Sequence, residues 1–239
     1  MNRETPALSE RLEFPFPLRE VHAGIPLANG VFGALIWGGE GELRITLNRA
    51  DYWDHRGGLE FTEEATYANL RQWLEEGNEA RLREVFEGRR EAAPGVPPRP
   101  TRLPMGRVDL GLPPNWDVIS GGLYLKTSEA EIEVARRIRP GLRAATGPRR
   151  PGEEARVRAI LLRDTPVLCL RVTGLDSDEL AFHGRPPESR EVLAQFQQYG
   201  IPAAQPFDFE EMAGWVQECP GETALCVAWM RTRSAGGVL

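Results

Sequence analysis

At 239 residues, the chain is long enough to bury the core of one domain or of two small ones. Its formal net charge of −6 comes from acidic and basic residues mixed along the sequence, which argues against nucleic-acid binding because that function needs a basic face. No apolar run approaches the roughly 20 residues that span a bilayer, so we expect no membrane insertion.

Residues 1–6 lack the apolar segment of a secretory signal peptide. The sequence as written therefore predicts a cytoplasmic protein, whereas a start site further upstream would leave export open. The three cysteines (Cys169, Cys219 and Cys226) contain no Cys-x-x-Cys pair and the three histidines are scattered, so we expect no metal site and no disulfide framework. Cys169 lies in an apolar run, which predicts a buried thiol.

Short strands dominate the predicted secondary structure. The nearly continuous apolar run 31–37 predicts a strand buried on both faces, and residues 42–48 alternate between apolar inner and polar outer positions. The glycine-rich residues 38–41 between them predict a hairpin turn. Further strands are predicted at 108–112, 123–125, 131–134, 156–162, 167–172 and 223–230, with a second hairpin turn at 163–166.

One region departs from this strand pattern. Apolar residues at helical spacing predict a helix over 63–76, capped by Thr62, and a second over 79–87, between Asn78 and Gly88. A further helical stretch is predicted near residues 192–196, five prolines make 94–104 an extended loop, and 139–152 is predicted to be an exposed hairpin tip.

These elements predict a fold class dominated by β-structure: a large two-sheet antiparallel β-sandwich with a short helical excursion at about 63–87. The sequence has no internal repeat and no linker long enough to mark a domain boundary. We therefore expect residues 1–239 to form a single domain.

The most specific pattern lies in residues 24–56, which read GIPLANGVFGALIWGGEGELRITLNRADYWDHR. This segment resembles the N-terminal signature of glycoside hydrolase family 95, in which a PLGNGxLGAxVxG stretch precedes LxLNxxxLW. Two positions depart from the signature, because Ala28 replaces a glycine and Tyr52 replaces a leucine. The matching residues are Pro26, Leu27, Asn29, Gly30, Gly33, Ala34, Gly38, Leu47, Asn48 and Trp53.

The resemblance implies the N-terminal sandwich domain of an inverting, α-L-fucosidase-like glycoside hydrolase. In that family catalysis takes place in an α/α barrel that follows the sandwich. We expect the barrel to be absent from this chain and to act in cis or in trans, because only a strand and a tail follow residue 222. The chain alone is then catalytically incomplete.

Other catalytic signatures are missing from the sequence. The adjacent glutamate pairs at 63–64, 75–76 and 210–211 are typical of solvated faces, and no GxSxG motif occurs. The glycine-rich turn at 38–41 precedes a strand instead of a helix, so it predicts no phosphate-binding loop. We therefore assign no catalytic residue and expect no cofactor.

A carbohydrate, a fucoside or a related glycoside, is the expected ligand. Amides and carboxylates hydrogen-bond sugar hydroxyls and an indole stacks on a pyranose ring. The candidate sugar-binding residues are Asn29, Asn48, Asp51, Trp53, His55 and Arg56. Each has a structural alternative: Asn29-Gly30 is a common hairpin turn, Asn48 and Asp51 suit local capping, and Trp53 suits a core.

Three functions remain open at this point. The first is a sandwich that supports a glycoside hydrolase barrel and lends loop residues to its sugar pocket. The second is a stand-alone, lectin-like carbohydrate-binding module that uses the Trp53 loop. The third is a structural module without a ligand.

Overall fold

A computed structural model describes residues 10–58, 62–86, 93–137, 152–220 and 223–232. Within these residues the strands form four antiparallel sheets, accompanied by three α-helices and two short 3-10 helices. The fold is therefore dominated by β-structure and sandwich-like, which confirms the predicted fold class.

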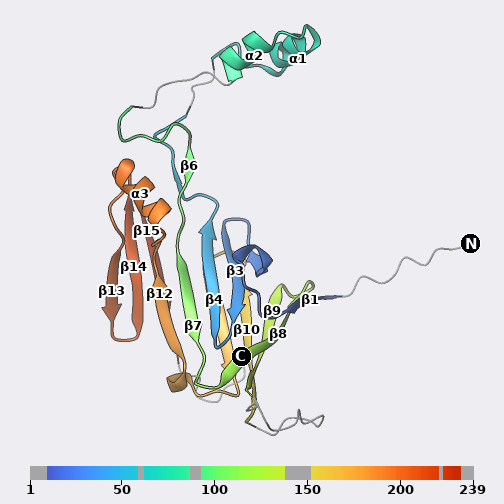
Figure 1. The fold of residues 1–239 in the computed structure, drawn as a ribbon, viewed down its shortest axis with the longest axis vertical. Helices are drawn as coiled ribbons and strands as arrows, with labels where there is room; N and C mark the ends of the chain where they lie inside the picture. Colours follow the sequence, from blue (N-terminus) through green and yellow to red (C-terminus); the bar gives the residue numbers. More distant parts are fainter. Residues whose placement is uncertain (1–9, 59–61, 87–92, 138–151, 221–222, 233–239) are drawn as a thin grey trace, which may run out of the picture.

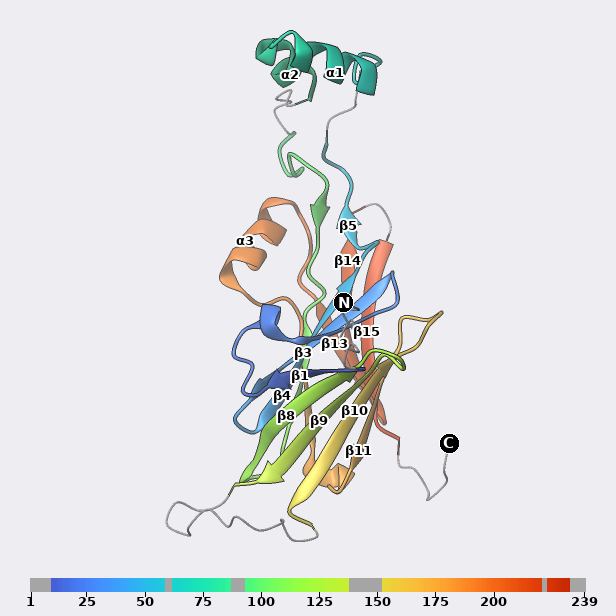
Figure 2. The same ribbon diagram turned by 90° about the vertical axis from the view of Figure 1, so that its right-hand side faces the viewer.

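Two five-stranded sheets form the sandwich (Figures 1 and 2). The first sheet has the order β1 (Arg11–Pro15), β8 (Trp116–Tyr124), β9 (Glu129–Arg136), β10 (Glu154–Leu161) and β11 (Leu168–Thr173). The second has the order β12 (Ala181–Arg185), β7 (Arg107–Gly111), β4 (Glu42–Arg49), β3 (Phe32–Gly39) and β2 (Ile25–Ala28).

A three-stranded sheet and a short ribbon complete the β-structure. The three-stranded sheet has the order β13 (Gln205–Phe209), β14 (Met212–Cys219) and β15 (Thr223–Met230), and β14 packs on β12. The ribbon pairs β5 (Trp53–Asp54) with β6 (Thr101–Arg102). The helices are α1 (Tyr67–Glu75), α2 (Glu79–Phe86) and α3 (Arg190–Gln198), with 3-10 turns at Val21–Ala23 and Ser177–Glu179.

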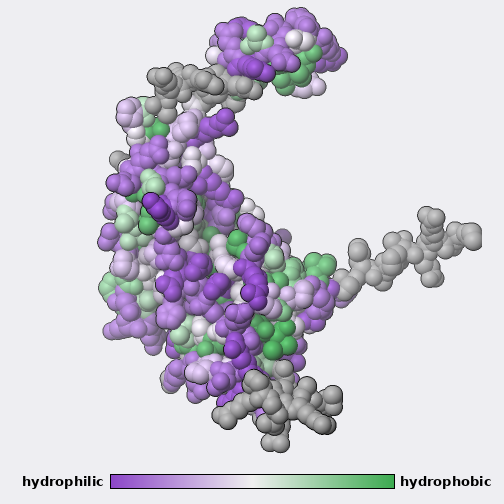
Figure 3. Space-filling view, viewed as in Figure 1, coloured by the Kyte–Doolittle hydropathy of each residue, from purple (hydrophilic) through white to green (hydrophobic). Residues whose placement is uncertain are grey.

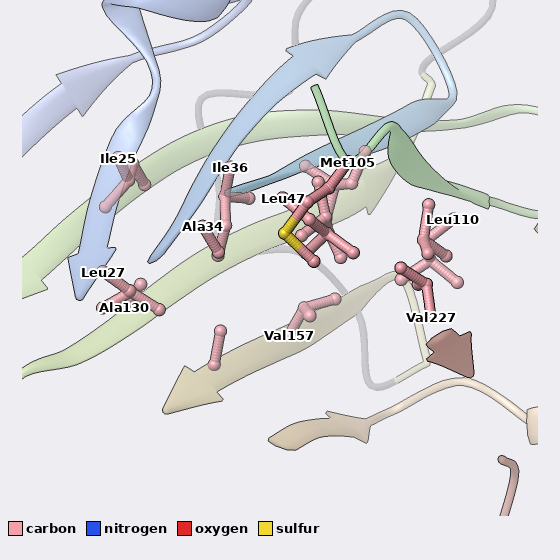
Figure 4. Packing of buried hydrophobic residues seen from close by; sticks show 14 of the residues in the cluster. Ile25, Leu27, Ala34, Ile36, Leu47, Met105, Leu110, Ala130, Val157 and Val227 are labelled. Atoms are coloured by element: carbon pink, nitrogen blue, oxygen red, sulfur yellow. The ribbon is translucent and has the colours of Figure 1, made fainter. Parts of the chain in front are cut away.

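The hydrophobic core lies between the two large sheets and extends to the three-stranded sheet. Figure 4 shows side chains from both large sheets and from β15 converging on the same interior. Ile36 and Leu110 of the second sheet are buried with Val157 of the first and Val227 of β15. Burial of this apolar surface is the main favourable contribution to folding.

The β3–β4 hairpin is confirmed, but β3 is buried on one face only. Phe32, Ala34 and Ile36 are buried, whereas Trp37 lies half-buried on the other face. The indole N–H of Trp37 donates to the Thr46 hydroxyl at 2.9 Å, and the Arg44 guanidinium lies 5.0 Å from its ring centre. Polar side chains of β4 thus pack beside Trp37 on this face in place of a second apolar layer.

The helical excursion is confirmed with a different starting point. α1 begins at Tyr67, and its cap is Thr66, whose side chain accepts the Asn69 N–H at 3.2 Å; Thr62 belongs to the preceding turn. Asn78 caps α2 through the Arg81 N–H at 3.2 Å, as expected. The two helices lie together at one end of the long axis, away from the large sheets (Figures 1 and 2).

Several further sequence predictions have a clear outcome. The predicted strands after residue 105, the 163–166 turn and the helix near 192–196 are present, and the 94–104 loop contains the short strand β6. Cys169 is exposed, which corrects the predicted burial, because it points outward from the edge strand β11. Gly88 and residues 139–151 of the predicted hairpin tip lie outside the described residues.

The exposed surface is mixed in character. In the view of Figure 3 hydrophilic residues predominate, and apolar residues gather in separate small groups. Among the described residues, no helix combines the length and apolar character needed to cross a membrane.

Candidate functional site

An open groove of about 650 Å³ lies beside the start of the β5–β6 ribbon, where the chain leaving β4 meets the turn between β14 and β15. One wall comes from the segment after β4 and the other from a segment more than 160 residues later. The lining residues are Arg49, Asp51, Tyr52, Trp53, His55, Arg56, Pro220, Ala224, Leu225 and Cys226. The groove therefore contains Asp51, Trp53, His55 and Arg56, four of the predicted sugar-binding residues.

Trp53 supplies an aromatic surface to this groove. Its indole N–H donates to the Ala50 carbonyl at 2.6 Å, which fixes the ring against the turn that follows β4. The ring stacks with His55 at 6.3 Å between centroids and 27° between planes. Trp53 is 37% exposed, so the alternative prediction that it belongs to the core is wrong.

Asp51 forms a two-point ion pair at the groove edge. Arg49 donates to both of its carboxylate oxygens, at 2.8 and 2.6 Å. These hydrogen bonds from Arg49 hold the pKa of the Asp51 carboxyl below its usual range. Both side chains are partly exposed, so the pair is a fixed set of donors and acceptors at the surface.

A second ion pair anchors the same loop to the protein body. Asp54 is buried, and Arg56 donates to its two oxygens at 3.0 and 2.8 Å, while the Arg56 backbone N–H donates at 3.1 Å. Hydrogen bonds from Arg56 lower the pKa of Asp54. Arg56 also donates to the Tyr199 carbonyl at 2.6 Å, which ties the loop to the end of α3.

Asn48 and Asn29 lie outside the groove. Arg102 of β6 donates to the Asn48 side-chain oxygen, so Asn48 helps to hold β6 beside the end of β4. Asn29 sits in the β2–β3 turn, where its side-chain oxygen accepts the N–H groups of Val31 and Phe32 at 3.1 and 2.8 Å. Asn29 therefore has the turn role that its alternative predicted, whereas the partner of Asn48 is Arg102, 54 residues away, and not a local cap.

Sequence reasoning missed the second wall and the residues beneath the groove. Tyr52 is buried, and the thiol of Cys219 donates to its hydroxyl oxygen at 3.1 Å. Burial raises the pKa of both the Tyr52 phenol and the Cys219 thiol. The only feature of the sequence that singled out Tyr52 was its departure from the family-like pattern. No feature of the sequence singled out Leu225 or Cys226.

The carboxyl groups of Asp51 and Asp54 lack the raised pKa of a general acid. A general acid needs a carboxyl whose pKa is raised, whereas arginine partners lower the pKa of both Asp51 and Asp54. Among the described residues, no cluster of His, Cys, Asp and Glu has the arrangement of a metal site. Fixed polar groups beside an aromatic ring remain as the chemistry of the site.

Comparison with known proteins adds no family assignment. The chain matches no model of a known protein family, and it matches no curated protein.

Proposed function

We propose that this chain is a carbohydrate-contacting, non-catalytic β-sandwich domain of a glycoside hydrolase similar to family 95. In this proposal the sandwich supports a helical catalytic barrel, and the loop 49–56 contributes to the sugar pocket. The resemblance of residues 24–56 to the family signature supports the enzyme class. The groove supports the contact with a sugar.

The observation that carries the sugar contact is the half-exposed Trp53 ring beside the Arg49–Asp51 pair. The apolar face of a pyranose packs on an indole, and its hydroxyl groups both donate and accept hydrogen bonds. Arg49 offers donors and Asp51 offers acceptors next to the ring, and both are held in place before a ligand arrives. Such preorganisation reduces the entropic cost of binding.

A specific feature also favours the second function, the stand-alone lectin-like module. The groove has two walls, so a sugar that packs on Trp53 also meets Leu225 and Cys226 on the opposite side. The two functions predict different affinities of the isolated chain for a glycan. A lectin-like module binds a glycan tightly alone, whereas a supporting domain binds weakly until the barrel closes over the ligand.

A titration with fucosylated oligosaccharides, followed by calorimetry, tests the proposal. We expect binding by the wild-type chain and a loss of about tenfold or more in Trp53→Ala, because an aromatic platform contributes about 1.4 kcal/mol or more. Trp73→Ala is the matched control, since Trp73 packs against Phe86 in the helical excursion. The control should bind as the wild type does.

Two results would contradict the proposal. Equal binding by the wild type and Trp53→Ala would remove the groove as the sugar site. Hydrolysis of an aryl α-L-fucoside by the purified chain alone would show that the domain is catalytically complete, contrary to the supporting role.

A further inference from the structure

The three-stranded sheet carries a row of exposed apolar residues across its width. The strand register places Phe209 opposite Met212 and Met212 opposite Met230. Directly opposite residues of antiparallel strands project from the same face. Their exposed fractions are 63%, 38% and 65%, so this row lies open to solvent.

The same face is apolar along most of its length. Phe207 stacks on Phe209 with 5.6 Å between ring centroids, and its ring lies so close to Gly214 that an added Cβ would meet it at 2.6 Å. Val216, Ala224, Cys226 and Ala228 continue this face, on which the polar residues are Gln205 and Glu218. The opposite face packs into the core through residues such as Trp215 and Val227.

This composition reverses the usual pattern of a sheet that faces water. The solvated face of an antiparallel sheet is normally polar, and a continuous exposed apolar surface marks an interaction site. None of the residues that the structure describes covers the row of Phe209, Met212 and Met230. It is therefore a candidate docking surface, and its surroundings indicate the chemistry of the partner.

Negative charge surrounds one end of this face. Glu210 and Glu211 form the β13–β14 turn and line a pocket of about 640 Å³ together with Met212 and Met230, and Asp208 of β13 lines it from the opposite face of the sheet. Their carboxylates make no hydrogen bond or ion pair with the residues that the structure describes.

Arg231 lines the same pocket, where the acidic residues outnumber it. Arg231 donates to the Leu180 carbonyl at 3.0 Å, and its guanidinium lies 5.4 Å from the centre of the Phe182 ring. The potential at this end of the apolar face is therefore negative. A partner with basic residues beside apolar ones complements it.

We propose that the outer face of β13, β14 and β15 docks a basic amphipathic helix of a partner protein. Neighbouring strands are about 4.8 Å apart, so the face of a three-stranded sheet is about as wide as the diameter of one helix, roughly 10 Å. Methionine side chains adapt to varied apolar partners, as in other surfaces that bind amphipathic helices. This inference goes beyond the sugar-binding proposal and does not depend on it.

The probe is a synthetic leucine–lysine peptide with helical spacing, labelled for fluorescence anisotropy. Its matched twin carries glutamate in place of every lysine. We expect the full chain to bind the lysine peptide about tenfold or more tightly than the glutamate peptide, with affinity falling as salt is added.

Two surface variants separate the apolar and the charged contributions. Met212→Ala with Met230→Ala should weaken binding of the lysine peptide about tenfold, and Glu210→Gln with Glu211→Gln should weaken it about threefold or more. Leu12→Ala is the control, because Leu12 is 45% exposed on β1 of the first sheet. It should leave binding unchanged.

Other results overturn the proposal. Equal binding of the two peptides, or binding that neither double variant alters, would show no specific basic partner. Dimerisation of the chain that the methionine variant abolishes, without peptide binding, would assign the surface to a second copy instead.

Discussion

The side-chain amide of Asn29 donates a hydrogen bond to the carbonyl oxygen of Leu162 at 3.0 Å, across 133 residues of sequence. It makes a second one to the Thr165 carbonyl at 3.1 Å. These bonds join the β2–β3 turn of the second sheet to the β10–β11 turn of the first. A residue of the family-like signature thus connects the two layers of the sandwich at one edge.

Replacement of Asn29 tests this connection. We expect Asn29→Ala to lower the free energy of unfolding by about 2 kcal/mol, because it removes four largely exposed hydrogen bonds that contribute about 0.5 kcal/mol each. Asn29→Asp keeps the acceptor for Val31 and Phe32 but has no N–H for Leu162, so it should also destabilise the fold. Urea denaturation measures both. Wild-type stability in both variants would show that the connection contributes nothing.

The buried ion pair of Asp54 and Arg56 predicts a loss of stability in acid. The pKa of Asp54 is lowered in the folded state, so its contribution is complete above the unfolded pKa of about 3.9 and is lost as pH falls below it. The stability difference between the wild type and Asp54→Asn should therefore shrink between pH 5 and pH 2. A difference that stays constant over this range would contradict the assignment.

Arg56→Ala should be the more damaging change in this pair. It leaves the buried Asp54 carboxylate without the guanidinium but with the backbone N–H of residue 56, which costs about 1–3 kcal/mol. It also removes the hydrogen bond to the Tyr199 carbonyl. Thermal unfolding of the single variants and of the double variant Asp54→Asn/Arg56→Ala measures the coupling, and the double variant should recover part of the loss.

Two glycines of the signature should respond differently to alanine. Gly30 has φ +95° with open space around the added Cβ, so Gly30→Ala should cost about 1 kcal/mol from backbone strain alone. At Gly38, φ is +114° and the Cβ would lie 2.5 Å from the Glu42 carbonyl oxygen. Gly38→Ala should cost about 3 kcal/mol or more. Equal melting temperatures for the two variants would refute this difference.

Local signals explain which parts of the fold the sequence predicted. The β3–β4 hairpin follows from alternation and a glycine-rich turn, both of which lie within residues 32–49. β2 and β13 escaped prediction because each contains a proline, Pro26 and Pro206, which is tolerated on edge strands but obscures the pattern. β5 has two residues, too few for any periodicity.

The candidate site was predictable on one side only. Asp51, Trp53, His55 and Arg56 are close in sequence, and the segment 50–56, which includes β5, brings them to one groove. The opposite wall depends on how the β14–β15 hairpin packs beside this loop. That packing is a long-range consequence of burying Leu225 and Val227, and no spacing in the sequence encodes it.

The three cysteines allow a final test of the groove. Cys226 lines the groove and is exposed, Cys169 is exposed on β11, and Cys219 is half-buried with a raised pKa. Since the thiolate is the reactive species, iodoacetamide should modify Cys219 most slowly. A bound fucosylated oligosaccharide should then slow modification of Cys226 and leave Cys169, the internal control, unaffected. Mass spectrometry of the labelled peptides measures each rate. Equal protection of both exposed thiols, or of neither, would place the sugar outside this groove.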